Sequence, residues 1–162
     1  MPAYLDHAAS TPLFPEALDA LVEVSRGFYA NPTGAHAPAR EARRVLEEAR
    51  DTMAGALGCL PREIVFTGGG TEADNLAIRG VHEARGGTLV TVAHEHHAVL
   101  HPVQHAGGRV VGATPRGTID LDQLRDALDP SVTLVSVMLA NNESGVVQPL
   151  DLWARARLAT GP

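Results

Sequence analysis

Ile64-Val65-Phe66-Thr67-Gly68-Gly69-Gly70-Thr71-Glu72-Ala73-Asp74-Asn75 is the stretch that decides the fold. Its β-branched and aromatic beginning predicts a strand over residues 63–67, its glycines predict a turn, and a helix is expected over residues 71–84. Backbone N–H groups in such a turn can approach an anion without obstruction by side chains, and the helix dipole favours negative charge there. The stretch therefore predicts a strand–turn–helix unit with a place for a phosphate group.

The same turn also has a purely structural interpretation. Thr71 can serve as the helix cap, with Asp74 completing a pair similar to a capping box. Glycines are common in turns for backbone reasons alone. The turn has neither the lysine of a Walker sequence nor the spacing of a G-x-G-x-x-G fingerprint. Taken alone, it leaves both interpretations open.

Strand and helix patterns alternate along the rest of the chain. A helix is expected over residues 15–28, and a second over residues 38–57, where Gly58 supplies the stop. Further strands and helices are expected beyond the glycine-rich turn, with Asp120 as the cap of the last helix: strands at 88–93, 109–113 and 132–139, and helices at 97–106 and 121–128. This alternation predicts an α/β fold with a mainly parallel sheet flanked by helices. The last strand is apolar without alternation, so we expect burial of both its faces.

Three of the predicted strand ends carry residues suited to binding. They are the segments 68–71, 94–97 and 141–143. Ligands of parallel sheets bind at the carboxyl ends of the strands. We therefore expect these three segments to converge on one crevice.

Histidines are concentrated in the second of these segments and beyond it. His97, His101 and His105 repeat every four residues, so they share one helical face. An H-E-x-x-H metal motif is not matched, because position 98 is Ala98. A histidine at a strand end can instead stack on a flat heteroaromatic ligand, and a solvent-exposed cluster is the third interpretation. We expect no metal site here.

The asparagines also permit two interpretations. Asn141 and Asn142 follow the most apolar strand, and their amides either donate to a ligand oxygen or form Asx turns. The loop Asn31-Pro32-Thr33-Gly34, with His36 beyond it, is either a connecting turn or part of a site. The residues alone do not decide between these interpretations.

Composition indicates an ordinary soluble protein. A chain of 162 residues can bury one core. All thirteen basic residues are arginine, against nineteen acids, for a net charge of −6, which argues against nucleic acid as a partner. The single cysteine, Cys59, excludes an internal disulfide and favours a reducing compartment. Residues 1–6 show no signal-peptide pattern, and no apolar run is long enough for a membrane. We expect a cytoplasmic protein.

The order of several segments resembles one known family. They are residues 4–12, Asn31-Pro32 with His36, and residues 62–75, 94–100, 117–120 and 135–149. Together they resemble the amino-terminal part of a cysteine desulfurase of the NifS/IscS group, within the class V aminotransferase-like enzymes. The resemblance covers nearly the whole chain and is highly specific.

This resemblance implies part of the large domain of the aspartate aminotransferase fold (fold type I). It implies a homodimeric pyridoxal 5′-phosphate enzyme that converts L-cysteine to L-alanine and passes the sulfur, as a persulfide, to a sulfur-acceptor protein. Gly70 and Thr71 match the phosphate-binding pair of the family. His96 matches the histidine that stacks on the cofactor ring and is credited with proton transfer. Asn142 matches the asparagine that contacts the phenolic oxygen of the ring.

The sequence departs from the family in having no lysine. The family's Schiff-base lysine, its persulfide-forming cysteine and the aspartate paired with the pyridinium nitrogen belong to a part with no counterpart here. Arginine cannot replace the lysine, because it stays protonated. Cys59 does not match the sulfur-accepting cysteine. We therefore expect an amino-terminal fragment that is inactive alone, with residues 1–14 irregular and residues 15–162 forming part of the large cofactor-binding domain.

Other functions are compatible with the same residues. One alternative is selenocysteine lyase or another class V aminotransferase-like enzyme. Another is a non-catalytic domain that binds a phosphate ligand or a partner protein. A partial sheet also leaves apolar surface exposed, so we expect self-association or a complementary carboxy-terminal half. The sequence does not distinguish iron–sulfur cluster assembly from other uses of the sulfur.

Overall fold

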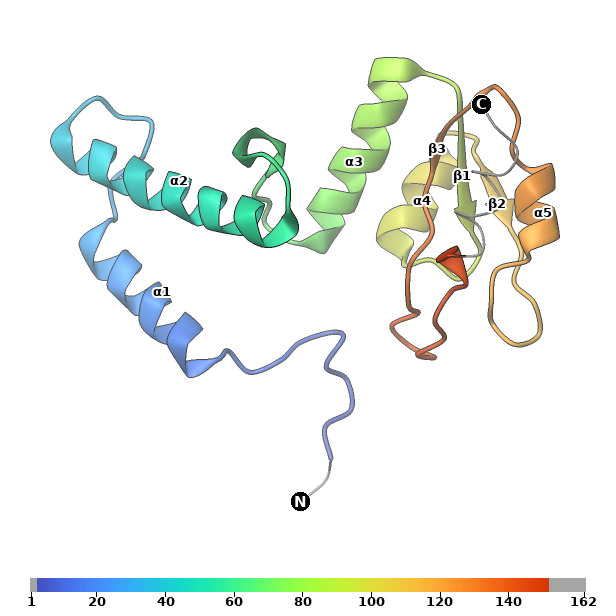
Figure 1. The fold of residues 1–162 in the computed structure, drawn as a ribbon, viewed down its shortest axis with the longest axis horizontal. Coiled ribbons are helices and arrows are strands. Elements are labelled where there is room, and N and C mark those ends of the chain that lie inside the picture. The colour runs from blue at the N-terminus through green and yellow to red at the C-terminus, as the bar shows by residue number, and fades with distance from the viewer. Residues whose placement is uncertain (1–2, 152–162) are drawn as a thin grey trace. The chain divides into compact units, whose positions relative to one another are not determined.

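The computed structural model describes residues 3–151 of the chain. The chain divides into two compact units, Met1–Phe66 and Thr67–Pro162 (Figure 1). Within its described residues the first unit contains helices and connecting segments, and the second unit contains the sheet. Among the described residues, no helix combines the length and the apolar character needed to cross a bilayer.

The first unit consists of two α-helices and one short 3₁₀ helix. They are α1 (Pro15–Gly27), α2 (Ala37–Leu57) and η1 (Pro61–Glu63). The Nδ1 atom of His36 accepts the N–H of Ala39 and so caps the start of α2. Gly58 ends α2 with a left-handed φ of 69°. Both predicted helices and the predicted stop at Gly58 are confirmed.

The strand predicted over residues 63–67 is wrong. Glu63 ends η1 and Ile64 is extended, but the described residues include no strand that pairs with this segment. Arg50 instead donates to the carbonyl of Ile64 at 2.6 Å and lies over the Phe66 ring at 5.0 Å. Val65 is 65% exposed. The β-branched pattern is present, but a strand also needs a neighbour to accept its backbone hydrogen bonds.

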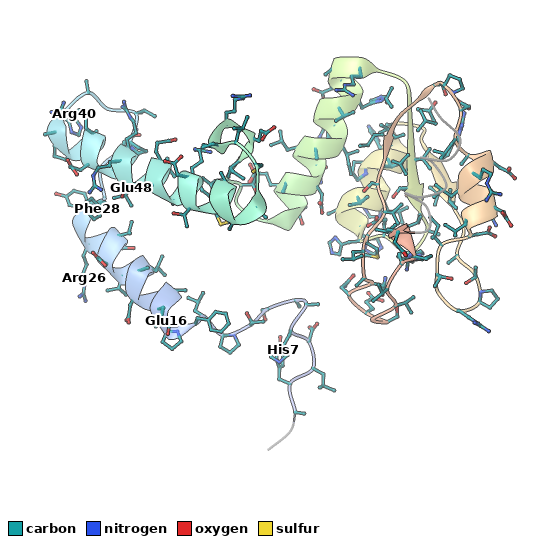
Figure 2. The ribbon with its side chains drawn as sticks, viewed as in Figure 1. His7, Glu16, Arg26, Phe28, Arg40 and Glu48 are labelled. Carbon is teal, nitrogen blue, oxygen red and sulfur yellow. The ribbon has the colours of Figure 1, made fainter. Side chains whose placement is uncertain are left out.

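The apolar side chains of the first unit are mostly exposed. No residue of α1 is buried, and Figure 2 shows Glu16, Arg26 and Phe28 along this helix and at its end. The exposed apolar residues of α1 and its approach include Leu13, Phe14, Leu18, Leu21, Val22 and Val24. In α2 only small residues are buried, namely Ala39, Ala42 and Ala54. Within the described part of this unit, no cluster of large buried apolar residues covers the apolar sides of these helices.

The second unit has a parallel sheet with helices on both faces. Its elements are α3 (Gly70–Arg85), β1 (Thr88–Val92), α4 (His97–His105), β2 (Arg109–Val111), α5 (Leu121–Asp126) and β3 (Val132–Val135). The strand order is β2-β1-β3 and both pairings are parallel. The prediction of a mainly parallel sheet flanked by helices is confirmed. The predicted cap at Asp120 is also confirmed, since its carboxylate accepts two N–H groups of α5.

The central strand β1 joins two apolar clusters. Val90 and Val92 pack on one face with β2 and α5, whereas Leu89 packs on the other face with Ile78 of α3 and Val103 of α4. Figure 1 shows α4 and α5 on opposite sides of the sheet. Alternate side chains of a strand point to opposite faces, so β1 serves both clusters.

The strand β3 is shorter and less buried than expected. It ends at Val135, and all four of its residues are half-buried. In the described part of the sheet it lies at the edge, with β1 on one side only. The expected burial of both its faces is therefore wrong, because its apolar run is not covered on every side.

Gly108, between α4 and β2, gives a test of this packing. A Cβ atom there would lie 2.6 Å from Val103 Cγ1 and 2.7 Å from the Leu89 carbonyl oxygen. Gly108→Ala should therefore lower the free energy of unfolding by about 1–3 kcal/mol, measured by urea denaturation. Gly80→Ala is the matched control, since Gly80 lies inside α3 with open space at its Cβ. This change should raise stability by up to about 1 kcal/mol. Equal effects would contradict the packing described here.

Candidate functional site

The amino-terminal end of α3 lies at the glycine-rich turn. The residue that caps this helix is Gly69, Gly70 is the first helical residue, and no side chain caps the N–H groups. The alternative in which Thr71 caps the helix is therefore wrong, because Thr71 lies inside the first turn. Glu72 reaches back, and its Oε2 atom accepts the N–H of Gly68 at 2.6 Å.

The turn leaves room for a ligand. Cβ atoms built at Gly69 and Gly70 would meet nothing within 4 Å. Within the described residues, the N–H groups of Gly70 and Thr71 and the hydroxyl of Thr71 have no hydrogen-bond partner. Free N–H groups at a helix start are suited to an anion. The end of α3 therefore fits a phosphate group.

His96 lies between the end of β1 and the start of α4. Its Nδ1 atom accepts the N–H of Ala98 at 3.1 Å, which caps α4. An accepting Nδ1 carries no proton, so the neutral ring holds its proton at Nε2. The ring is exposed. His96 therefore presents a flat face and one N–H donor outside the helix cap.

The two asparagines after β3 have different roles. Asn141 forms an Asx turn, in which its Oδ1 atom accepts the N–H of Glu143 at 3.0 Å and that of Ser144 at 2.8 Å. Its Nδ2 atom donates to the carbonyl of His94 at 2.9 Å. Within the described residues, the side chain of Asn142 forms no hydrogen bond. The turn interpretation is thus correct for Asn141, and the amide of Asn142 is left for another partner.

Two cavities meet at His96. The larger, of about 830 Å³, lies along α3 and α4 and is lined by Thr71 and His96, among others. The smaller, of about 370 Å³, is lined by His96, Gly117 and Asn142, among others. His96 and its neighbour His97 line both, whereas Thr71 and Asn142 each line one. The expected convergence of three strand ends on one crevice is thus replaced by two cavities that share His96 and His97.

The repeating histidines of α4 line the larger cavity. His97 and His101 have ring centroids 4.8 Å apart, and His105 lies one turn further on. His82 of α3 lines the same cavity. Within residues 3–151, no group of three or more His, Cys, Asp or Glu side chains is placed to hold a metal ion.

The smaller cavity has buried polar atoms without partners. Both ring nitrogens of His94 and the Oε1 atom of Glu95 are buried without a hydrogen bond. Burial lowers the pKa of His94, and a nearby Gln148 side chain opposes this shift. Burial raises the pKa of Glu95, and the backbone groups of Met138 and His96 oppose that shift. Burial thus acts against a charge on both His94 and Glu95.

Two residues and one contact of the site were missed by the sequence analysis. Glu72 accepts the N–H of Gly68, and Asn75 donates to the carbonyls of Thr71 and Ala98 at 2.9 and 3.3 Å. The bond from Asn141 to the carbonyl of His94 was also not expected. The only sequence signal for Asn75 is its position four residues after Thr71, on the same helical face. The contact with Ala98 is not visible in the sequence.

The buried ring of His94 gives a pH prediction. Its pKa is lowered from 6.5 by folding, so the unfolded chain binds the proton more readily. The contribution of neutral His94 to the free energy of unfolding is therefore fully present above pH 6.5. It decreases as the pH falls below 6.5 towards the pKa of the folded state. His94→Gln should therefore lose less stability than the wild type between about pH 7.5 and about pH 5.5, measured by urea denaturation. His101→Gln is the control for removal of an exposed histidine. If the stability of His94→Gln falls with decreasing pH as steeply as that of the wild type, the prediction is contradicted.

Comparison with known proteins agrees with the fold and with the resemblance. The family model described as Aminotransferase class-V matches residues 3–158. An IscS-like cysteine desulfurase of Mycobacterium tuberculosis is 44% identical over 162 residues, covering 91% of this chain and 41% of that protein. The chain thus spans about two fifths of the length of this curated relative.

Solved structures give the same result. A structure described as a NifS-like protein matches with a TM-score of 0.86 and 34% identity, covering 96% of this chain and 45% of that one. A structure described as SspA in complex with cysteine matches with a TM-score of 0.83 and 35% identity, over 97% of this chain and 48% of that one. The resemblance and the expected fold are confirmed, and the chain belongs to the class-V aminotransferase family.

Proposed function

We propose that the chain is the amino-terminal part of a cysteine desulfurase that uses pyridoxal 5′-phosphate. The reaction converts L-cysteine to L-alanine, and the sulfur leaves as a persulfide for an acceptor protein, as in iron–sulfur cluster assembly. One observation carries the proposal: His96 lines both cavities, with Thr71 in one and Asn142 in the other. The relatives named as cysteine desulfurases and the relative described with bound cysteine support it.

Each proposed role fits the geometry of the residue. The free N–H groups of Gly70 and Thr71 and the Thr71 hydroxyl bind the phosphate. The exposed ring of His96 stacks on the flat cofactor ring and holds a proton at Nε2. The unpaired amide of Asn142 donates to the ring oxygen. When bound, pyridoxal phosphate supplies an electron sink for the reacting amino acid.

The chain contributes only some of the groups that this chemistry needs. Its 162 residues include no lysine. In the proposal, the lysine that links the cofactor and the cysteine that accepts sulfur come from outside this chain. A homodimer partner or a complementary carboxy-terminal half also covers the exposed apolar side of α1. Residues 15–162 then form part of the large cofactor-binding domain, preceded by the segment 1–14, in a cytoplasmic enzyme.

A second function is favoured by the missing lysine. A chain with a phosphate-binding turn but no covalent link to a cofactor can serve as a non-catalytic domain for a phosphate ligand or a partner protein. Reconstitution of activity distinguishes this function from the first.

The first test supplies the missing part. The carboxy-terminal region of the Mycobacterium tuberculosis relative, beginning after its match to this chain, is co-expressed with the chain. We expect a complex that forms alanine from cysteine in the presence of pyridoxal phosphate. His96→Ala should lower this rate roughly 10²–10⁴-fold, because a proton donor and a stacking face are lost.

Gln104→Ala is the control, since Gln104 is an exposed residue of α4 that lines neither cavity. It should keep most of the rate. A stable complex with no alanine formation would support the non-catalytic function. An equal loss in both variants would contradict the role of His96.

The second test uses the chain alone. Because it has no lysine, pyridoxal phosphate followed by borohydride should leave no internal residue modified, as read by peptide mass spectrometry. Any trapped adduct should lie on the amino terminus. Absorbance typical of a lysine-bound cofactor, or an adduct inside the chain, would refute this expectation.

A further inference from the structure

The side chain of Asn141 is bonded on both of its polar atoms. Its Nδ2 atom donates to the His94 carbonyl at 2.9 Å and lies 3.5 Å from the sulfur of Met138. Its Oδ1 atom accepts the Glu143 N–H at 3.0 Å, and the N–H and hydroxyl of Ser144 at 2.8 and 3.0 Å. One side chain thus joins the end of β1 to the loop after β3.

The backbone of Asn141 holds the same loop closed. Its N–H donates to the Val146 carbonyl at 3.0 Å, and its carbonyl accepts the Gly145 N–H at 2.9 Å. Ala140 and Val147 form an isolated antiparallel bridge just outside this closure. The loop is therefore a compact turn organised around one residue.

The bond between Asn141 and His94 lies beyond the last paired residues of β1 and β3. The pairing of β1 with β3 ends at Val90 and Val135, followed by a bond from the Ser136 N–H to the Val90 carbonyl and one from the Thr91 hydroxyl to the Ser136 carbonyl. The segment of His94 and the loop of Asn142 both lie beyond this point. The bond from Asn141 to His94 is thus a side-chain replacement for sheet pairing at the edge of the smaller cavity.

We propose that Asn141 is a positioning residue that sets the distance between His96 and Asn142. His96 follows the bonded carbonyl of His94 by two residues, and Asn142 is the next residue after Asn141. Movement of the loop would separate the ring-facing histidine from the amide that faces the ring oxygen. This inference rests on the proposed function, which places a cofactor ring between these two residues.

Only an amide satisfies both sides of the connection. An aspartate keeps the acceptor for Glu143 and Ser144 but has no donor for His94, and a serine is neutral but too short to reach it. Asn31 provides a matched control, because its Oδ1 atom accepts the N–H and hydroxyl of Thr33 at 3.0 and 2.9 Å. Within the described residues its Nδ2 atom forms no hydrogen bond. Asn31 is therefore an Asx turn without the second connection.

The test measures two ligands on the full chain by calorimetry or ³¹P NMR. Inorganic phosphate reports on the start of α3 alone. Pyridoxamine phosphate adds the ring and has no aldehyde, so it forms no imine with the amino terminus. We expect Asn141→Asp and Asn141→Ser to weaken the binding of pyridoxamine phosphate roughly five- to tenfold. Phosphate binding should change less than about twofold, and Asn31→Asp should change neither ligand.

Two further outcomes separate the inference from the function on which it rests. No binding of pyridoxamine phosphate by the wild type would contradict the proposed function. Amide ¹H–¹⁵N spectra then test the positioning directly without ligand, since Asn141→Ser should shift the signals of residues 94–97 as well as those of residues 142–145. Unchanged signals at residues 94–97, or an equal loss of both ligands in the variants, would overturn the inference.

Discussion

The pairing of β1 on both of its edges is the constraint on which the described site depends. β1 bonds β2 on one side and β3 on the other, and its side chains enter both apolar clusters. A strand held in this way cannot slip by one residue, because every side chain would move to the opposite face. The residues that leave its carboxyl end therefore begin from a fixed point. His94, Glu95 and His96 are the first polar side chains beyond it.

Polar groups at this end of the sheet each have two uses. His96 caps α4 with one nitrogen, and its other nitrogen forms no hydrogen bond within the described residues. Asn141 closes its own turn with the oxygen and holds β1 with the nitrogen. Asn75 bonds both Thr71 of its own helix and Ala98 of α4. These bonds hold the backbone around the two cavities, whereas the side chains of Thr71 and Asn142 and the second ring nitrogen of His96 form no hydrogen bond within residues 3–151.

The first unit presents a different physical situation. The helices α1 and α2 each have an apolar side, but their large apolar residues, such as Leu18, Leu21 and Met53, are exposed. Exposure of this extent favours contact with another apolar surface. The two-fifths coverage of the curated relative supports the proposal that such a surface belongs to a part outside this chain.

Local signals in the sequence were sufficient for the helices and their ends. Gly58 and Asp120 act through their own backbone neighbours, and the strand–helix alternation indicated the parallel sheet. The order of motifs also identified the family, because many short segments must match together. For Gly70, Thr71, His96 and Asn142, the sequence supplied candidates whose roles stay proposals.

Tertiary structure decided what depends on distant residues. The segment 63–67 has the composition of a strand, yet it is not one here, since pairing requires a neighbour that no local pattern supplies. Asn141 and Asn142 are identical in kind, but Asn141 closes a local turn with its oxygen and donates to the carbonyl of His94, 47 residues away, whereas the side chain of Asn142 forms no hydrogen bond within the described residues. The sequence by itself thus determined the elements, the family and the candidate residues. Only the fold decided which polar groups are already bonded and which are available, because hydrogen bonds between distant segments exist only once the chain is folded.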